Sequence, residues 1–175
     1  YVAAMTPRFR DRIRLNTPIE TVHRHADSVN VTPRGQPTEG FDHVVFACHS
    51  DQALRILADA TPIERELLGA FPYERNSAVL HTDESLLPRR RRAWASWNYQ
   101  IPSEPTAHAT VSYCMNILQH IRSPHTFCVT LNSDERIDPA KVLGRFEYHH
   151  PIFTTRRAAM QARHREMLNV NRTSF

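Results

Sequence analysis

Alternating apolar and polar residues predict a β-hairpin and a buried strand in the early part of the chain. Val29 and Val31 alternate with polar residues after a turn at residues 26–28, which predicts a hairpin over residues 22–34. Residues 42–48 are almost continuously apolar, which is typical of a short strand covered on both faces. We therefore expect a hairpin and a buried strand in the part of the chain before about residue 50.

Two helices are expected after this strand. Residues 51–60 carry apolar side chains at helical spacing, and Ser50 or Asp51 can cap the first helix. Residues 61–64, Thr-Pro-Ile-Glu, form a capping box with proline at the first helical position. A second helix is therefore expected to run from there to Leu68.

The later part of the chain alternates with period two in several segments. These segments predict an antiparallel sheet with one buried face, and they cover residues 77–82, 94–99, 111–117 and 127–131. Asp138 and Pro139 begin a short helix, and a longer polar helix is expected over residues 155–168. Residues 171–175 begin an extended segment for which we expect no partner strand. The pattern indicates an α+β fold whose organisation changes near residue 50.

Glycine is scarce in this sequence, and the scarcity excludes some binding motifs. Four of the 175 residues are glycine, about 2% against a usual level near 7%. Neither a G-x-G-x-x-G dinucleotide fingerprint nor a G-x-x-x-x-G-K-[ST] phosphate loop can be written with these positions.

The positive charge of the chain is weak evidence for a nucleic-acid partner. The net charge is +4, with 22 basic and 18 acidic residues, and Lys141 is the one lysine. Residues 89–92 are a run of four arginines close to Trp94 and Trp97, and bases stack on aromatic rings in nucleic-acid sites. The alternative is a solvated turn with half-buried tryptophans, and we favour it because the other arginines are spread along the chain.

The cysteines and histidines indicate neither a disulfide framework nor a metal site. Cys48, Cys114 and Cys128 lie in apolar stretches with no C-x-x-C spacing, which fits a reducing, cytoplasmic compartment. His23 and His25 lack a third ligand, so no metal is expected. Residues 48–50, Cys-His-Ser, are interpreted as a strand-to-helix turn, not as a cysteine nucleophile. No apolar run is long enough for an integral membrane segment.

An aromatic cluster is the candidate binding surface. Its members lie on adjacent predicted strands and comprise Trp94, Trp97, Tyr99, Tyr113 and Asn116. Aromatic walls with a few polar groups line small-ligand pockets, and they also fill ordinary sheet cores. The residues alone leave both readings open.

Taken in order, these segments resemble a known family. Residues 13–22 (Ile-Arg-Leu-Asn-Thr-Pro-Ile-Glu-Thr-Val), the hairpin and residues 42–50 resemble the flavin-containing amine oxidase superfamily. Later segments resemble a bacterial branch described as NAD/FAD-binding or amine-oxidase-like. These segments are residues 71–73, 75–76, 78–83, 86–88 and 94–99, with Tyr113, Met115, Asn116, Leu118 and Gln119.

The resemblance implies a division of the chain into parts of a longer flavoenzyme. Members of the superfamily open with a βαβ unit bearing G-x-G-x-x-G and close near the flavin ring, and neither segment is found in this sequence. Residues 1–50 would be the later part of a Rossmann-like FAD-binding domain with a β-hairpin. Residues 51–165 would be a substrate-binding domain of antiparallel sheet plus helices, and residues 166–175 would begin the return to the FAD domain.

The function implied by the resemblance is that of an FAD-dependent oxidoreductase of amine-oxidase type. A hydride would pass to the flavin from a small amine or lipid-like substrate. Ile19 would contact FAD through its backbone, and Ala47, Cys48 and His49 would lie near the cofactor at a strand end.

The aromatic cluster would form the substrate wall, and the resemblance identifies no catalytic base. It leaves the oligomeric state open. We expect this piece alone to be inactive and to bind FAD weakly or not at all. The alternatives are a non-catalytic module for nucleic acid or another anionic partner, and a cofactor-free structural relative.

Overall fold

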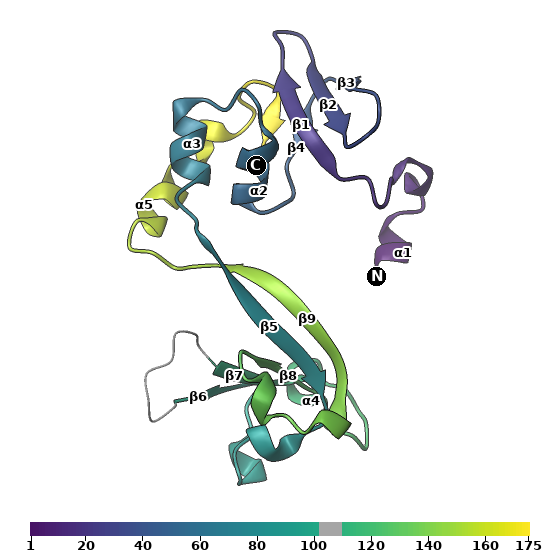
Figure 1. The fold of residues 1–175 in the computed structure, drawn as a ribbon, viewed down its shortest axis with the longest axis vertical. Coiled ribbons are helices and arrows are strands. Elements are labelled where there is room, and N and C mark those ends of the chain that lie inside the picture. Colours follow the sequence, from purple (N-terminus) through teal and green to yellow (C-terminus); the bar gives the residue numbers. More distant parts are fainter. Residues whose placement is uncertain (102–109) are drawn as a thin grey trace. The chain divides into compact units, whose positions relative to one another are not determined.

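The structure, a computed structural model, describes residues 1–101 and 110–175 and divides into two compact units (Figure 1). The first unit contains Tyr1–Pro72 and Ile152–Phe175, and the second contains Tyr73–Pro151. Helices and antiparallel sheets are mixed, which confirms the α+β class. Ala53 and Leu57 pack on the hairpin, so the first unit continues beyond residue 50.

The first unit is built around a three-stranded antiparallel sheet. Strands β1 (Ile19–Arg24), β2 (Val29–Pro33) and β3 (Glu39–Phe41) lie in that order, and β1 and β2 form the hairpin expected from the sequence. Helices α2 (Ser50–Ile56) and α3 (Pro62–Leu68) follow. The short helix α1 (Val2–Met5), a 3₁₀ turn at Arg10–Arg12, α5 (Arg157–Ala162) and a 3₁₀ turn at His164–Met167 complete the helical part of this unit.

The two predicted helices are confirmed, and one cap differs from the expectation. Thr61 Oγ1 accepts the Glu64 N–H at 3.3 Å, and the Glu64 carboxylate accepts the Thr61 N–H at 2.7 Å, so the capping box is present. Helix α2 is capped by His49, not by Ser50 or Asp51, and the His49 N–H donates to the Gln52 side chain at 3.3 Å.

The strand expected over residues 42–48 is much shorter in the structure. Strand β4 contains only Val44–Val45, and Val45 is 69% exposed, so the strand is not covered on both faces. Strand β10 (Thr173–Ser174) pairs with it in parallel. The expectation that the final segment has no partner was therefore wrong. The sequence pattern missed this pairing because it joins segments far apart in the chain.

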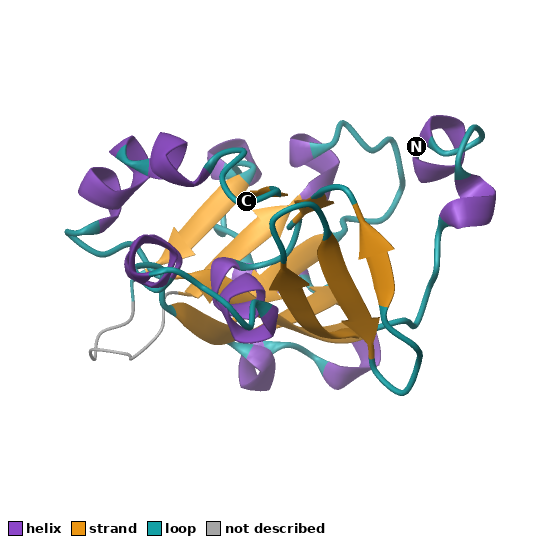
Figure 2. Ribbon diagram, turned by 90° about the horizontal axis from the view of Figure 1, so that it is seen from above, coloured by secondary structure: helices purple, strands orange, loops and turns teal. Residues whose placement is uncertain are grey.

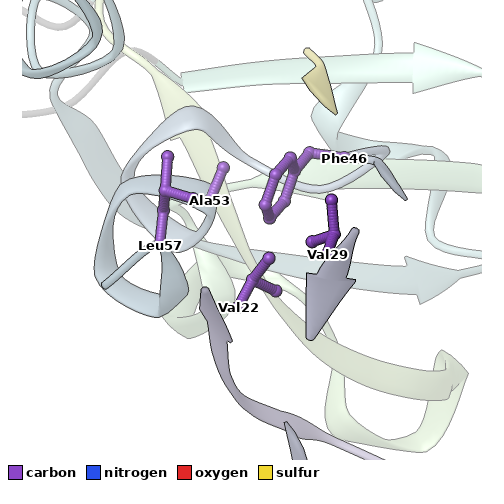
Figure 3. Packing of buried hydrophobic residues seen from close by; sticks show 5 residues of the cluster. All are labelled: Val22, Val29, Phe46, Ala53 and Leu57. Carbon is purple, nitrogen blue, oxygen red and sulfur yellow. The ribbon is translucent and has the colours of Figure 1, made fainter. Parts of the chain in front are cut away.

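The core of the first unit joins the sheet to helix α2. Val22 and Val29 of the hairpin pack with Phe46, Ala53 and Leu57, and the five side chains converge in Figure 3. Because Ala53 and Leu57 belong to this cluster, helix α2 is part of the same folding unit as the hairpin.

A buried ion network ties three segments of the first unit together. Arg24 of β1 donates through Nε to Asp59 Oδ2 at 2.9 Å and through both terminal nitrogens to the Glu64 carboxylate. It also donates to the Asp59 carbonyl at 3.0 Å and to Thr173 Oγ1 at 3.1 Å. All five donors of the guanidinium are therefore used. The side chains of Arg24 and Glu64 are 3% and 1% exposed.

The second unit is a five-stranded antiparallel sheet with the order β6-β7-β8-β5-β9. The strands are β5 (Tyr73–His81), β6 (Trp97–Gln100), β7 (Thr110–Cys114), β8 (Cys128–Leu131) and β9 (Val142–Pro151). Helix α4 (Met115–Leu118) and 3₁₀ turns at Glu84–Leu86, Arg91–Ala93, Asp134–Arg136 and Pro139–Lys141 connect them. Four strands match predicted segments, and β9 was not predicted.

Helices are short throughout the described residues, as Figure 2 shows. The longest, α2 and α3, contain seven residues each. Over residues 1–101 and 110–175, none has the length and apolar character needed to cross a lipid bilayer.

Candidate functional site

One face of the five-stranded sheet carries large aromatic and aliphatic side chains and is partly open to solvent. Cross-strand partners point to the same side of a sheet, so the strand register assigns residues to faces. Two rows run across this face, which we call the aromatic face: Trp97–Tyr113–Val129–Leu80, and Tyr99–Val111–Leu131–Ala78–Phe146. Tyr148 of β9 lies on the same face.

The aromatic face presents its rings at its two ends. Trp97 and Tyr99 are 66% and 63% exposed on β6, and Phe146 and Tyr148 are about half exposed on β9. The rings of Trp97 and Tyr113 meet edge to face, with centroids 5.6 Å apart and an interplanar angle of 70°. This surface can bind apolar or aromatic groups, and it can hold a cation against the ring faces.

The opposite face of the same sheet is covered and carries small and polar side chains. Its fully buried positions include Val79, His81, Ser112, Cys114, Cys128 and Thr130. Leu86, Leu87, Ile137 and Trp94 pack over it. The sheet therefore has the one buried face that the period-two pattern predicted, and the small residues occupy it.

The structure brings together three of the five residues proposed for the substrate wall. Trp97, Tyr99 and Tyr113 share the aromatic face. Trp94 lies on the covered side with Leu87, where its Nε1–H donates to the Pro88 carbonyl at 2.8 Å.

Asn116 is in helix α4 and not on a strand. Its side chain is used locally: it donates to the His125 carbonyl at 2.9 Å and accepts the Phe127 N–H at 2.7 Å. Trp94 and Asn116 therefore lie away from the aromatic face, and together they line a separate pocket of about 250 Å³. The alternation over residues 111–117 did not reveal that the strand ends at Cys114.

Sequence reasoning missed Phe146 and Tyr148, which extend the aromatic face. They alternate with Arg145, Glu147 and His149 along β9. Nearly the whole strand is exposed, and the residues that alternate with its aromatic side chains are charged or polar. No buried apolar set therefore marks it as a strand. The alternation of aromatic and charged residues was the available signal.

One arginine of the run at residues 89–92 lies over the ring of Trp94. Arg91–Ala93 form a 3₁₀ turn, and the Arg91 guanidinium carbon lies 4.9 Å from the centre of the Trp94 ring. The half-buried Trp94 therefore already stacks on an arginine of its own chain and is not presented as a platform for a base.

A buried polar chain crosses the covered face of the sheet. The Asp83 N–H donates to His81 Nδ1 at 3.1 Å, so the proton of the neutral imidazole lies on Nε2, which is 2.8 Å from Thr130 Oγ1. Thr130 Oγ1 is in turn 2.8 Å from Ser112 Oγ. Burial lowers the pKa of His81 and keeps it neutral.

The carboxylate of Asp83 completes this arrangement. Burial acts to raise its pKa, but the N–H groups of Asp138 and Ser85 and the Lys141 ammonium lower it far more, so Asp83 is ionised. His81 and its polar partners are fully buried, and they hold strands together and do not face the aromatic side.

The first strand of the first unit offers a backbone site at Ile19. The Arg34 N–H donates to the Pro18 carbonyl at 2.9 Å, which flanks the Ile19–Pro33 pair of the β1–β2 ladder. In an antiparallel pair flanked in this way, the N–H and C=O of Ile19 point away from β2. No other strand in the part of the chain that the structure describes pairs with this end of β1.

A cleft lies beside Ile19. Its volume is about 530 Å³, and Ile19, Val31 and Phe41 provide apolar lining. Arg14 and Glu39 form a bidentate ion pair at its border.

Ala47, Cys48 and His49 follow β4 at its carboxyl end. Parallel pairing of β4 with β10 places them where ligands collect in parallel sheets. Ala47 and Cys48 are exposed, and His49 caps helix α2. Although Cys48 is exposed as a residue, desolvation of its sulfur by neighbouring atoms raises the pKa of the thiol, which disfavours a nucleophilic thiolate.

The structure groups no metal-binding set within residues 1–101 and 110–175. No three or more His, Cys, Asp or Glu side chains come close enough there to hold an ion. The rings of His23 and His25 do lie together, with centroids 4.8 Å apart.

Solved structures with the same fold are flavin amine oxidases and related enzymes. Putrescine oxidase bound to putrescine matches with a TM-score of 0.60 at 11% identity, covering 99% of this chain and 45% of that one. The CLA-producing fatty acid isomerase from P. acnes matches with a TM-score of 0.56 at 14% identity, covering 91% and 41%. Cyclohexylamine oxidase from Brevibacterium oxydans IH-35A matches with a TM-score of 0.52 at 14% identity, covering 81% of this chain and 35% of that one.

These matches confirm at the level of the fold the likeness that the sequence motifs indicated. The chain spans less than half the length of each of these enzymes. No protein-family model and no curated protein sequence matches it.

Proposed function

We propose that this chain is part of an FAD-dependent oxidoreductase of amine-oxidase type, in which the aromatic face forms a wall of the substrate site. The observation that carries the proposal is the shared fold with putrescine oxidase and cyclohexylamine oxidase. The sequence motifs around Ile19 and residues 42–50 support it independently. The flavin, when bound, would supply the redox chemistry by accepting a hydride from the substrate.

In this proposal the first unit contributes to cofactor binding. The outward N–H and C=O of Ile19 would hydrogen-bond the edge of the adenine, and the apolar cleft beside them would accommodate its face. Ala47, Cys48 and His49 would lie near the cofactor at the carboxyl end of β4. The residues present fit the cofactor on this point, because β1 offers a donor and an acceptor that its sheet does not use.

The second unit would bind the substrate. Trp97, Tyr99 and Tyr113 present apolar ring faces, which suit either a small amine held by cation–π contact or a lipid-like chain held by burial. Both substrate classes stay within the proposal, since the similar structures include amine oxidases and a fatty acid isomerase.

Flavin content tests the proposal. The chain in its complete coding context should purify with the visible absorbance of a flavin, or gain it on reconstitution with FAD, whereas the 175-residue chain alone should bind FAD weakly. A colourless complete product that takes up no FAD would contradict the proposal.

Two pairs of variants of the complete product test the assigned residues. Ile19→Pro removes the outward N–H and should weaken FAD affinity, whereas Ile19→Val retains it and should bind normally. Trp97→Ala should raise KM for the substrate. Trp94→Phe, on the covered side of the same sheet, should leave KM unchanged.

A further inference from the structure

Strand β9 forms a long outer edge of the five-stranded sheet. It pairs with β5 over its length, and within the described residues no strand pairs with its other side. An edge of this kind presents a row of N–H and C=O groups that can bond to another strand. Its side chains are nearly all exposed.

The hydrogen-bond pattern fixes which backbone groups lie on the open side. The Ile152 N–H donates to the Pro72 carbonyl at 2.8 Å, which flanks the Tyr73–Pro151 pair. The next pair therefore exchanges hydrogen bonds, and the alternation continues without a register shift as far as Gly144.

Even-numbered residues of this stretch accordingly bond to β5. The N–H and C=O groups of Arg145, Glu147 and His149 point outward. The hydrogen bonds on the other side of β5 are consistent with this alternation. The Asn132 N–H donates to the Ser77 carbonyl at 3.2 Å, so the odd-numbered residues of β5 bond to β8 and its even-numbered residues are left to bond to β9.

Among the registers centred on Arg145, Phe146 and Glu147, the charges on β9 favour one for pairing with a second copy of the strand. Antiparallel pairing about a two-fold axis centred on Arg145 would oppose two arginines, and centring it on Glu147 would oppose two carboxylates. Centring on Phe146 places Arg145 of each copy opposite Glu147 of the other, with their outward backbone groups in position to bond. Opposite charges across strands stabilise pairing, and like charges oppose it.

The same register brings the two Phe146 side chains together. They form a closely spaced pair of the kind that does not exchange hydrogen bonds, in which side chains pack best. Phe146 and Tyr148 are 50% and 52% exposed in the single chain, so pairing would bury apolar surface.

The ion pairs that these charges make within one chain do not oppose the arrangement. Arg145 contacts Asp134 at 2.9 Å, and Glu147 pairs with Arg75. The side chains of both pairs are between 35% and 73% exposed, so exchanging them for cross-strand pairs changes little.

We propose that the chain forms a two-fold dimer through antiparallel pairing of β9 with β9 of a second copy, centred on Phe146. The pairing makes one continuous sheet with the aromatic faces of both copies on the same side. This inference rests on β9 alone and is independent of the proposed function.

Sedimentation velocity of the 175-residue chain over a concentration series tests the proposal. A thiol reductant is included so that the exposed Cys48 does not cross-link copies. The chain should sediment as a dimer, and Arg145→Glu or Glu147→Arg should each weaken dimerisation by about tenfold or more. Thermal unfolding of each variant shows that the monomer remains folded.

Variants that restore charge complementarity provide the decisive part of the sedimentation experiment. The double variant Arg145→Glu/Glu147→Arg should dimerise again. An equimolar mixture of the two single variants should form a heterodimer, because one carries two acids and the other two bases in this stretch. A monomeric wild type, single reversals without effect, or a mixture that stays monomeric while the wild type dimerises would each overturn the proposal.

Discussion

Removing Arg24 should destabilise the first unit far more than removing an exposed arginine with similar geometry. Arg24 and Glu64 form a bidentate pair whose side chains are 3% and 1% exposed. Arg14 and Glu39 form another bidentate pair in the same unit, but its side chains are 56% and 36% exposed. Arg24→Leu and Arg14→Leu therefore make the same chemical change in a buried and in a solvent-exposed ion pair, respectively.

The magnitude follows from what Arg24→Leu leaves behind. The Glu64 carboxylate stays buried, retains the Thr61 N–H as a partner and loses its counter-ion. Breaking a buried pair by removing one partner costs about 3–5 kcal/mol. Arg14→Leu leaves a carboxylate that water solvates, so its effect on the free energy of unfolding should be close to nil.

Neutralising the unpaired Glu64 carboxylate should recover part of the stability lost in Arg24→Leu. The variant Arg24→Leu/Glu64→Gln retains an acceptor for the Thr61 N–H and removes the uncompensated charge, so it should be more stable than Arg24→Leu alone. Burial acts to raise the pKa of Glu64, but Arg24 and Thr61 lower it by more, to a value below the ordinary 4.5. In the unchanged chain, the stabilisation that the ionised Glu64 carboxylate provides is therefore present above about pH 4.5. It is lost as the pH falls through the lower pKa that Glu64 has in the folded chain.

Urea unfolding measures these differences. Far-UV circular dichroism follows the whole chain, and tryptophan fluorescence follows the second unit only, since both tryptophans lie there. Arg24→Leu should shift the circular dichroism transition to lower urea. The reasoning is refuted if Arg24→Leu destabilises the chain no more than Arg14→Leu.

Three further predictions concern single side chains. Because burial lowers the pKa of His81 from 6.5, protonation favours the unfolded state. The stability of the second unit, followed by tryptophan fluorescence, should therefore be full above pH 6.5 and fall below it by up to roughly 1 kcal/mol per pH unit, and His81→Gln should flatten this dependence. Thr61→Ala should cost about 1 kcal/mol in urea unfolding by removing the cap of α3, whereas a loss within error would show that the capping box contributes little. Of the three thiols, only Cys48 should react with a thiol reagent in the folded chain, since Cys114 and Cys128 are buried and burial raises the pKa of Cys128 to about 12; labelling of all three without denaturant would contradict the buried placement.

The elements that the sequence predicted well are those whose signals are local. The capping box at Thr61 and Glu64 satisfies backbone groups within four residues, so it defines the start of α3 without reference to the rest of the fold. The hairpin is similar, because β1 and β2 are joined by a short turn and pair in register from Arg24–Val29 to Thr21–Thr32.

The elements that were missed depend on distant partners. Strand β10 exists because residues 173–174 pair with residues 44–45, and no local pattern encodes that pairing. Strand β9 has almost no buried side chains, so its period-two pattern lacks the apolar set by which strands are identified. The packing of the two helices also depends on distant partners, because α2 packs on the hairpin and α3 packs with Met160 and Met167 near the end of the chain.

The candidate site shows how far a periodic pattern can be taken. Alternation in β7 and β8 predicted two faces and one buried set, and the structure buries Ser112 and Thr130 while Tyr113 and Val129 stay partly exposed. Which face is covered depends on the segments that pack against it, here Leu86, Leu87, Ile137 and Trp94. Those segments shield the covered face from solvent. The hydroxyl groups and the imidazole on this face form hydrogen bonds with one another.

The larger side chains are therefore left on the face that the other segments of the second unit leave partly open. An open sheet face that bears several aromatic rings exceeds what scattered surface apolar residues explain. A face of this composition is stable in water only at a cost, and the cost is removed when a ligand or another protein segment covers the rings. This physical argument, and not the aromatic residues alone, indicates that the aromatic face is covered, either by a ligand or by another protein segment.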